Sequence, residues 1–141
     1  MEEDRAAWTL AADVPLAAAR HQLLSIAKDT AAVRGFFDPE TSTISYLVHD
    51  RRTKRGAVID SVLDYDAAAG RTSTASAEAI MEYVRAEGIA IDWLLETHAH
   101  ADHLSAAAWI KERLGGAIAI GEHIRDVQAV FGDIFNAGPE F

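Results

Sequence analysis

One heptapeptide, 97–103, concentrates the metal-binding chemistry of this chain. It reads T-H-A-H-A-D-H, so three of the six histidines and an aspartate fall within six consecutive positions, namely His98, His100, Asp102 and His103. Neutral imidazole and carboxylate are ligands that zinc and non-haem iron prefer. The alternative is a polar turn whose histidines only cap a helix. It is disfavoured, because three crowded imidazoles repel one another near their ordinary pKa unless a cation organises them as neutral ligands.

The backbone around the heptapeptide is expected to direct its side chains toward a common point. Residues 91–96 are mostly apolar, which predicts a short buried strand. His98 and His100 stand two apart on extended backbone, so they point to the same side and can reach one ion. Asp102 and His103 follow where the chain turns into a helix, so they face a neighbouring position. Two metal ions would suit hydrolysis, with Asp102 as the candidate catalytic carboxylate, whereas one iron would suit oxygen chemistry.

The rest of the chain is expected to alternate strands and helices, which is the pattern of the α/β class. Strands are predicted at 33–37, 44–49, 57–60, 91–96 and 117–120. Residues 61–76 are predicted to be a long loop. Helices should follow this loop, the heptapeptide and the last strand, and Gly115 should end the second of them. The last helix is predicted to bury an apolar stripe that includes Val130 and Phe131.

Length and composition indicate one domain with few classes of partner. The chain has 141 residues, 50% of them hydrophobic, which is enough for a core. Its net charge of -9 argues against nucleic acid as a partner, and the basic run 51–55 is typical of a solvated turn. The absence of cysteine excludes a disulfide framework and a thiol nucleophile. No long apolar run indicates a secretory or membrane-spanning segment, so the expected location is the cytoplasm.

The heptapeptide matches the pattern H-x-H-x-D-H, and through it the chain resembles the metallo-β-lactamase superfamily. Two flanking stretches, G-R-T-S-T-A-S at 70–76 and H-A-D-H-L-S-A-A at 100–107, resemble the persulfide dioxygenase and glyoxalase II branch. The resemblance covers about 33–141, which leaves 1–32 as an N-terminal helical extension. It implies the N-terminal half of an αββα sandwich, a mixed sheet flanked by helices. One sheet face should then lack its cover, which predicts self-association or a complementing half.

The resemblance also implies roles for individual residues. In a persulfide dioxygenase, one Fe(II) would use His98 from this chain, and His100, Asp102 and His103 would serve its surroundings or an unused second site. In a glyoxalase II-like thioester hydrolase, His98 and His100 would hold one zinc ion and the other two residues a second. Asp60 would lie behind the metal site and hold the histidine loop, although an aspartate there could equally cap the next loop.

Three functions follow as expectations. The first is oxidation of a small thiol derivative, glutathione persulfide, to sulfite with O₂. The second is hydrolysis of a glutathione thioester, and the third is that the chain is an inactive fragment or an interaction module. Enzymes of this kind need further ligands, and the one histidine after His103 is His123, which is more typical of a helix cap. We therefore expect the chain by itself to lack a complete site and to be inactive.

Overall fold

The computed structural model of the protein describes residues 30–138. Its elements are β1 (Ala31–Asp38), β2 (Thr43–Asp50), β3 (Arg55–Ile59), β4 (Val62–Asp66), β5 (Arg71–Ser73), α2 (Ala75–Ala86), β6 (Ala90–Glu96), β7 (Leu104–Ser105), α3 (Ala107–Leu114), β8 (Ala117–Ile120) and α4 (Ile124–Phe135). The five predicted strands are confirmed as β1, β2, β3, β6 and β8. Most of the predicted N-terminal extension lies outside the described residues.

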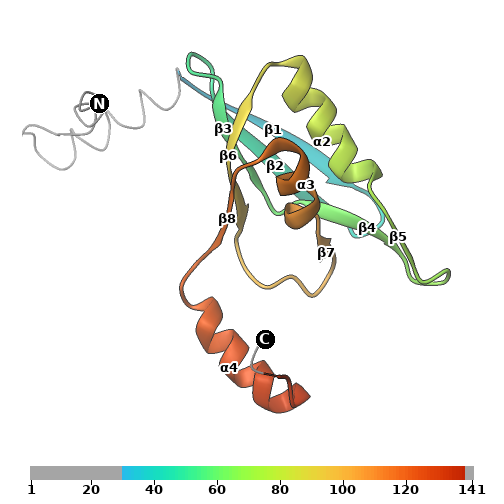
Figure 1. Cartoon of the computed structure of the whole chain (residues 1–141). Helices are drawn as coiled ribbons and strands as arrows, with labels where there is room; N and C mark the ends of the chain where they lie inside the picture. The colour runs from blue at the N-terminus through green and yellow to red at the C-terminus, as the bar shows by residue number, and fades with distance from the viewer. Residues whose placement is uncertain (1–29, 139–141) are drawn as a thin grey trace, which may run out of the picture. The chain divides into compact units, whose positions relative to one another are not determined.

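Five strands form one mixed sheet in the order β1-β2-β3-β6-β8 (Figure 1). Strand β2 runs antiparallel to β3, whereas β3, β6 and β8 run parallel to one another. A crossover through α2 joins β3 to β6, and a crossover through α3 joins β6 to β8, as parallel neighbours require. The result is the α/β sheet expected from the sequence, and the parallel strands end side by side at one edge.

A second, smaller sheet occupies the stretch that was predicted to be a loop, so that prediction is wrong. Strand β4 pairs antiparallel with β5 and with β7, in the order β5-β4-β7. The carboxylate of Asp64 also ties this hairpin to α2, because it accepts hydrogen bonds from the amide and the hydroxyl of Ser76 at 3.1 and 2.5 Å. Strand β7 lies about forty residues further along the chain, so the composition of β4 alone gave no sign of this partner.

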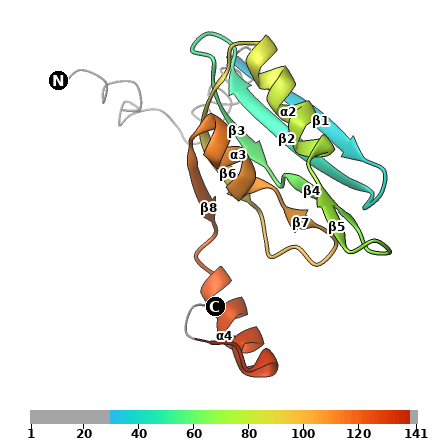
Figure 2. The same ribbon diagram turned by 45° about the vertical axis from the view of Figure 1, so that its right-hand side comes forward.

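Helices α2 and α3 cover one face of the five-stranded sheet, as both views of the ribbon show (Figure 2). The core between them is apolar and includes Leu47, Val58 and Leu94 from the sheet, Ile80 from α2 and Ile110 from α3. Each fully buried aliphatic side chain of this size contributes roughly 1.5–3 kcal/mol to the free energy of folding. This core fixes β3 and β6 against each other, and these two strands carry the site.

The opposite face of the sheet has no covering layer within residues 30–138. Strand β2 alternates buried and exposed side chains, with Leu47 buried and Tyr46 exposed. The strand register places Tyr46 beside Ile59 on β3, and Trp93 beside Ala57, so all four share the uncovered face. The exposed large apolar residues of this face are Val33, Phe37, Ile44, Tyr46 and Trp93. The resemblance implied such an open face.

Helix α4 differs from its prediction in burial. The helix itself is confirmed, but none of its residues is buried, so the predicted buried stripe is wrong. Val130 and Phe131 are among its exposed apolar residues, and an apolar stripe is buried only where another surface meets it. No helix in the described part of the chain is long and apolar enough to cross a membrane.

Candidate metal centre

The site is built where the parallel strands β3 and β6 end next to each other. The chain leaves β3 at Asp60 and leaves β6 at the heptapeptide 97–103. The amide of Asp60 donates a hydrogen bond to the carbonyl of Leu95 at 2.9 Å, which keeps the two strand ends together. Asp60 has a φ of 50°, a left-handed conformation that aspartate tolerates better than most residues. This turn points its carboxylate at the heptapeptide.

The far end of the heptapeptide is also anchored. Strand β7 follows it directly and pairs with β4, with Ser105 opposite Val62. The amide of Ala106 then donates to the carbonyl of Ser61 at 2.9 Å, just before α3 begins. The loop of histidines is therefore held by a sheet at both ends. Such a frame favours a fixed arrangement of side chains over a mobile one.

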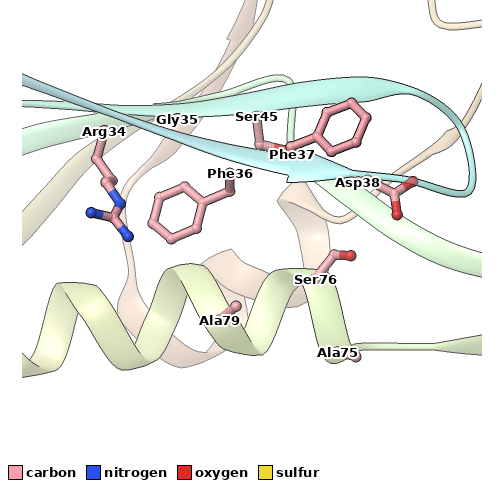
Figure 3. Close-up of a pocket in the computed structure, with 9 residues that line it drawn as sticks. All are labelled: Arg34, Gly35, Phe36, Phe37, Asp38, Ser45, Ala75, Ser76 and Ala79. Atoms are coloured by element: carbon pink, nitrogen blue, oxygen red, sulfur yellow. The ribbon is translucent and has the colours of Figure 1, made fainter.

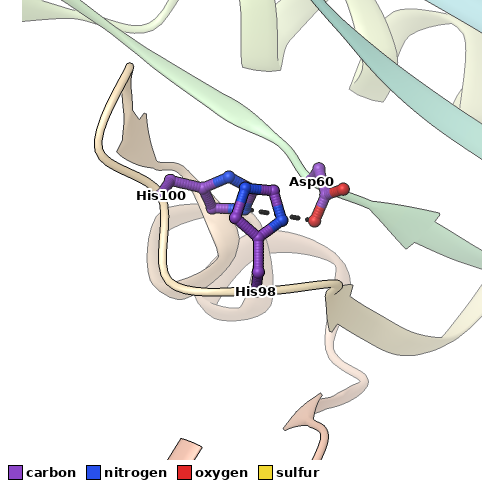
Figure 4. Close-up of side chains that lie close together, drawn as sticks. All are labelled: Asp60, His98 and His100. Carbon is purple, nitrogen blue, oxygen red and sulfur yellow. Dashed lines mark hydrogen bonds and ion pairs between the residues drawn. The ribbon is translucent and has the colours of Figure 1, made fainter. Parts of the chain in front are cut away.

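The structure brings all five residues singled out from the sequence together. The ring centroids of His98 and His100 are 4.4 Å apart, and those of His100 and His103 are 4.1 Å apart. One carboxylate oxygen of Asp102 lies 3.3 Å from Nδ1 of His103. Two groups have ligand atoms close enough to share a cation, namely Asp60 with His98 and His100, and His100 with Asp102 and His103. Figure 4 shows the first group converging from β3 and from the loop after β6.

Buried ring nitrogens without hydrogen bonds show that these residues fit a metal ion. The side chains of His103 and His100 are only 1% and 6% exposed. Nε2 of His103 and Nδ1 of His100 are buried and make no hydrogen bond, and the buried Nδ1 of His103 has only the Asp102 carboxylate nearby, at 3.3 Å. A buried polar group left without a partner costs about 1–3 kcal/mol, which coordination to a cation would recover. The side chain of Asp102 is 53% exposed, so it can also reach a second ion or a substrate.

Asp60 is held as a carboxylate. Burial by itself raises its pKa, but hydrogen bonds from the amide and hydroxyl of Thr97, together with the hydrogen bond from His100, outweigh burial, so the pKa is lowered. The Thr97 amide donates to Oδ1 at 2.8 Å and its hydroxyl to Oδ2 at 2.7 Å. Oδ1 also lies 3.1 Å from Nε2 of His100. The carboxylate thus faces the histidine loop, as the resemblance implied, and its hydrogen bonds go there.

Two further positions contact the ligands, and the sequence analysis gave them no role. Glu96 places Oε2 at 2.8 Å from Nε2 of His100, and its other oxygen accepts a hydrogen bond from the hydroxyl of Ser105. Thr43 donates to a carboxylate oxygen of Asp102 at 3.1 Å. An acidic residue at the end of the apolar run of β6, directly before the heptapeptide, was the signal for Glu96. Thr43 had no local signal, since it lies 59 residues away.

A separate cavity of about 440 Å³ lies between β1 and the first turns of α2 (Figure 3). Its lining includes Arg34, Phe36, Asp38 and Ser76. None of the heptapeptide residues lines it. Asp38 is occupied there by hydrogen bonds from the amide and hydroxyl of Thr41 at 3.0 and 2.5 Å. Metal-ligating side chains converge at the histidine cluster and not in this cavity.

Comparison with known proteins identifies the family. Residues 39–139, most of the chain, match the family model described as the metallo-beta-lactamase superfamily. The chain belongs to the metallo-beta-lactamase superfamily. The membership expected from the heptapeptide is thereby confirmed, and so is the fold.

Relatives in this superfamily carry names from different kinds of enzyme. A probable metallo-hydrolase of Burkholderia pseudomallei is 61% identical over 109 residues, which are 77% of this chain and 37% of that protein. Human persulfide dioxygenase ETHE1, a mitochondrial protein, is 28% identical over 120 residues, or 84% of this chain and 43% of that protein. The crystal structure of ETHE1 from Myxococcus xanthus superposes with a TM-score of 0.52 at 28% identity, covering 62% of this chain and 34% of that one.

The chain spans less than half of the length of each of these relatives. Their names include both a hydrolase and a dioxygenase. The comparisons show the superfamily, and the geometry shows a histidine cluster that could hold a metal ion.

Proposed function

We propose that this chain supplies part of the metal site of a persulfide dioxygenase. The reaction would be oxidation of glutathione persulfide by O₂ to sulfite, and the metal Fe(II). The observation that carries the metal part is the convergence of ligand atoms from Asp60, His98 and His100, where Nδ1 of His100 is buried and makes no hydrogen bond. Similarity to human persulfide dioxygenase supports the reaction. The stretches 70–76 and 100–107, which resemble that branch, support it as well. We place the reaction in the cytoplasm, where the glutathione pool is kept reduced.

The residues of this chain would hold the metal and order its surroundings. Bound Fe(II) would activate O₂, and the outer sulfur of glutathione persulfide would supply the four electrons that reduce it, leaving glutathione and, with one water molecule, sulfite. His98, the exposed member of the cluster, would be the iron ligand from this chain. Asp60 and Glu96 would hold the loop and His100 in place through the hydrogen bonds described above. Asp102, half exposed beside the cluster, is the carboxylate best placed to meet substrate.

A second candidate function is hydrolysis of a glutathione thioester by a zinc site of the glyoxalase II kind. The observation that favours it is the presence of two groups of ligands, not one. His98 and His100 would hold one ion, and Asp102 and His103 the other. Zinc would polarise the carbonyl and activate water for attack. The 61% identity to a probable metallo-hydrolase supports this candidate.

The two candidates can be separated in a longer protein with this chain's residues grafted in. We suggest replacing the matching 109-residue segment of the Burkholderia metallo-hydrolase with the segment of this chain. The hybrid, loaded with Fe(II) or zinc, would be assayed with glutathione persulfide and with S-lactoylglutathione, and with His98→Ala as the control. Sulfite formation with O₂ consumption supports the dioxygenase. Thioester hydrolysis alone replaces it with the second candidate, and metal binding without either reaction favours an interaction module.

A further inference from the structure

We propose that Thr97 is a positioning residue that sets the tautomer of His98 by relaying the charge of Asp60. This inference deepens the proposed metal site and rests on it. Thr97 precedes the pattern H-x-H-x-D-H, which therefore assigns no role to it. In the structure, however, its hydroxyl lies between the Asp60 carboxylate and the imidazole of His98.

The direction of the two hydrogen bonds fixes where the protons are. Both carboxylate oxygens of Asp60 accept hydrogen bonds from Thr97, Oδ1 from the amide and Oδ2 from the hydroxyl, so the carboxylate acts as an acceptor. The Thr97 hydroxyl has a single hydrogen and donates it to Asp60 Oδ2 at 2.7 Å. Its oxygen also lies 2.8 Å from Nδ1 of His98. With its hydrogen already given to Asp60, the hydroxyl can only accept there. Nδ1 of His98 must therefore carry the proton, and Nε2 keeps the lone pair.

His100 has the opposite tautomer, which is set by direct contact with two carboxylates. Its Nε2 lies 2.8 Å from Glu96 and 3.1 Å from Asp60, and both groups are acceptors when ionised. Nε2 of His100 therefore carries the proton. Its lone pair is on Nδ1, the buried nitrogen that has no hydrogen-bond partner. His98 therefore offers Nε2 to a metal ion, whereas His100 offers Nδ1. The Asp60 carboxylate helps to set both tautomers, through Thr97 for His98 and by direct contact for His100.

A fixed tautomer matters because a ring nitrogen that carries a hydrogen cannot bind a metal ion. Metal-ligating histidines generally donate their other N–H to a fixed acceptor, which raises affinity by holding the ring and its tautomer. His98 is exposed, so packing constrains its ring little. The hydrogen bond with the Thr97 hydroxyl is therefore the main contact that fixes the orientation of the His98 ring. Loss of this hydroxyl is expected to weaken metal binding by about 10–100-fold, as for other partners of metal ligands.

The test compares Thr97→Val with Thr97→Ser. Valine keeps the shape and the amide hydrogen bond to Asp60 but removes the hydroxyl, whereas serine keeps the hydroxyl. Histidine ring ¹⁵N shifts would be measured in metal-free protein over a pH series, and the tautomer would be read where the shifts no longer change as the pH rises. We expect Nδ1–H at His98 in the unchanged chain and in Thr97→Ser. In Thr97→Val we expect a shift toward Nε2–H at His98 and no change at His100, which reports that the loop is still folded.

Zinc affinity, measured by competition with a chromophoric chelator, gives a second readout. Thr97→Val should bind zinc about 10–100-fold more weakly than the unchanged chain, and Thr97→Ser should restore most of the affinity. Nε2–H at His98 in the unchanged chain, or an unaltered tautomer in Thr97→Val, would overturn the inference. The tautomer is read without metal. A chain that shows the relay but binds no zinc would therefore contradict the proposed function and leave the relay intact.

Discussion

At the scale of single residues, the chemistry of this site depends on which carboxylate serves which histidine. Asp60 receives both hydrogen bonds of Thr97, while Glu96 lies closer to His100 than Asp60 does. Ser105 holds the second oxygen of Glu96 in place. The histidine motif therefore supplies only the candidate metal ligands of the site. Glu96, just before the heptapeptide, holds one of these ligands, His100, in place.

The first prediction concerns Glu96. Glu96→Ala should weaken zinc binding by about 10–100-fold, because His100 loses its nearer acceptor and the site loses one negative charge. Glu112→Ala is the matched control, since it removes the same charge from an exposed position on α3. Chelator competition would measure both variants. Equal affinities for the two would mean that Asp60 alone is sufficient to hold His100.

At the scale of elements, the parallel pair β3 and β6 places the site, and β2 holds β3 from the other side. Gly56, on β3 opposite His49, makes this contact possible. A Cβ at Gly56 would lie 2.7 Å from the carbonyl oxygen of Val48 and 2.8 Å from Cβ of His49, which is too close for real atoms. The close approach of these two strands thus depends on a residue without a side chain.

The second prediction follows from this close approach. Gly56→Ala should lower the free energy of unfolding by about 1–3 kcal/mol, the usual cost of overpacking a site that cannot easily move. Gly121→Ala is the control, because a Cβ there meets nothing within 4 Å. Urea denaturation would compare the two variants with the unchanged chain. If Gly56→Ala were as stable as Gly121→Ala, the strands would have room to separate.

The strands and helices also differ in how well the sequence predicts them. Apolar runs predicted the five strands of the main sheet. The end of α3 was predicted at Gly115, which has a positive φ of 77°. The contacts that sequence reading missed were long-range. Thr43 reaches Asp102 and β4 finds β7 only after the chain has folded. Burial of α4 was predicted wrongly, since periodicity identifies an apolar stripe but not the surface that covers it.

At the scale of the whole molecule, the open face of the main sheet governs association. We propose that a second copy of this chain or a complementing half covers it, because large apolar side chains from β1, β2 and β6 share that face. The net charge of -9 opposes contact between copies. Added salt screens this repulsion and should therefore strengthen association.

The third prediction tests this association. Trp93→Glu should reduce self-association, because Trp93 is 50% exposed and lies beside Ala57 on the open face. Tyr65→Glu is the control, since Tyr65 is equally exposed, at 49%, but lies on the small sheet. Sedimentation velocity at several salt concentrations would follow both variants. A monomeric unchanged chain at high concentration would show that the face is not covered by a second copy.

The last prediction concerns activity, and it depends on how many ligands the chain can offer. Among the described residues, the two candidate groups share His100, and Asp60 is already engaged by Thr97. One ion therefore draws mainly on His98 and His100, and the other on Asp102 and His103. A catalytic zinc normally has three protein ligands, and an iron facial triad needs two histidines and one carboxylate.

We therefore expect the 141-residue polypeptide by itself to show negligible persulfide dioxygenase or thioesterase activity. A loosely held metal cannot fix the geometry that orients O₂ or water against a substrate. The measurement is turnover by the iron- or zinc-loaded chain, with His98→Ala as the control and the Burkholderia relative as the full-length reference. Activity close to that reference, abolished by His98→Ala, would contradict the prediction. The missing ligands would then come from a second copy or from His123, which lies exposed at the start of α4 beside Asp126. A His123→Ala variant that kept this activity would assign them to the second copy.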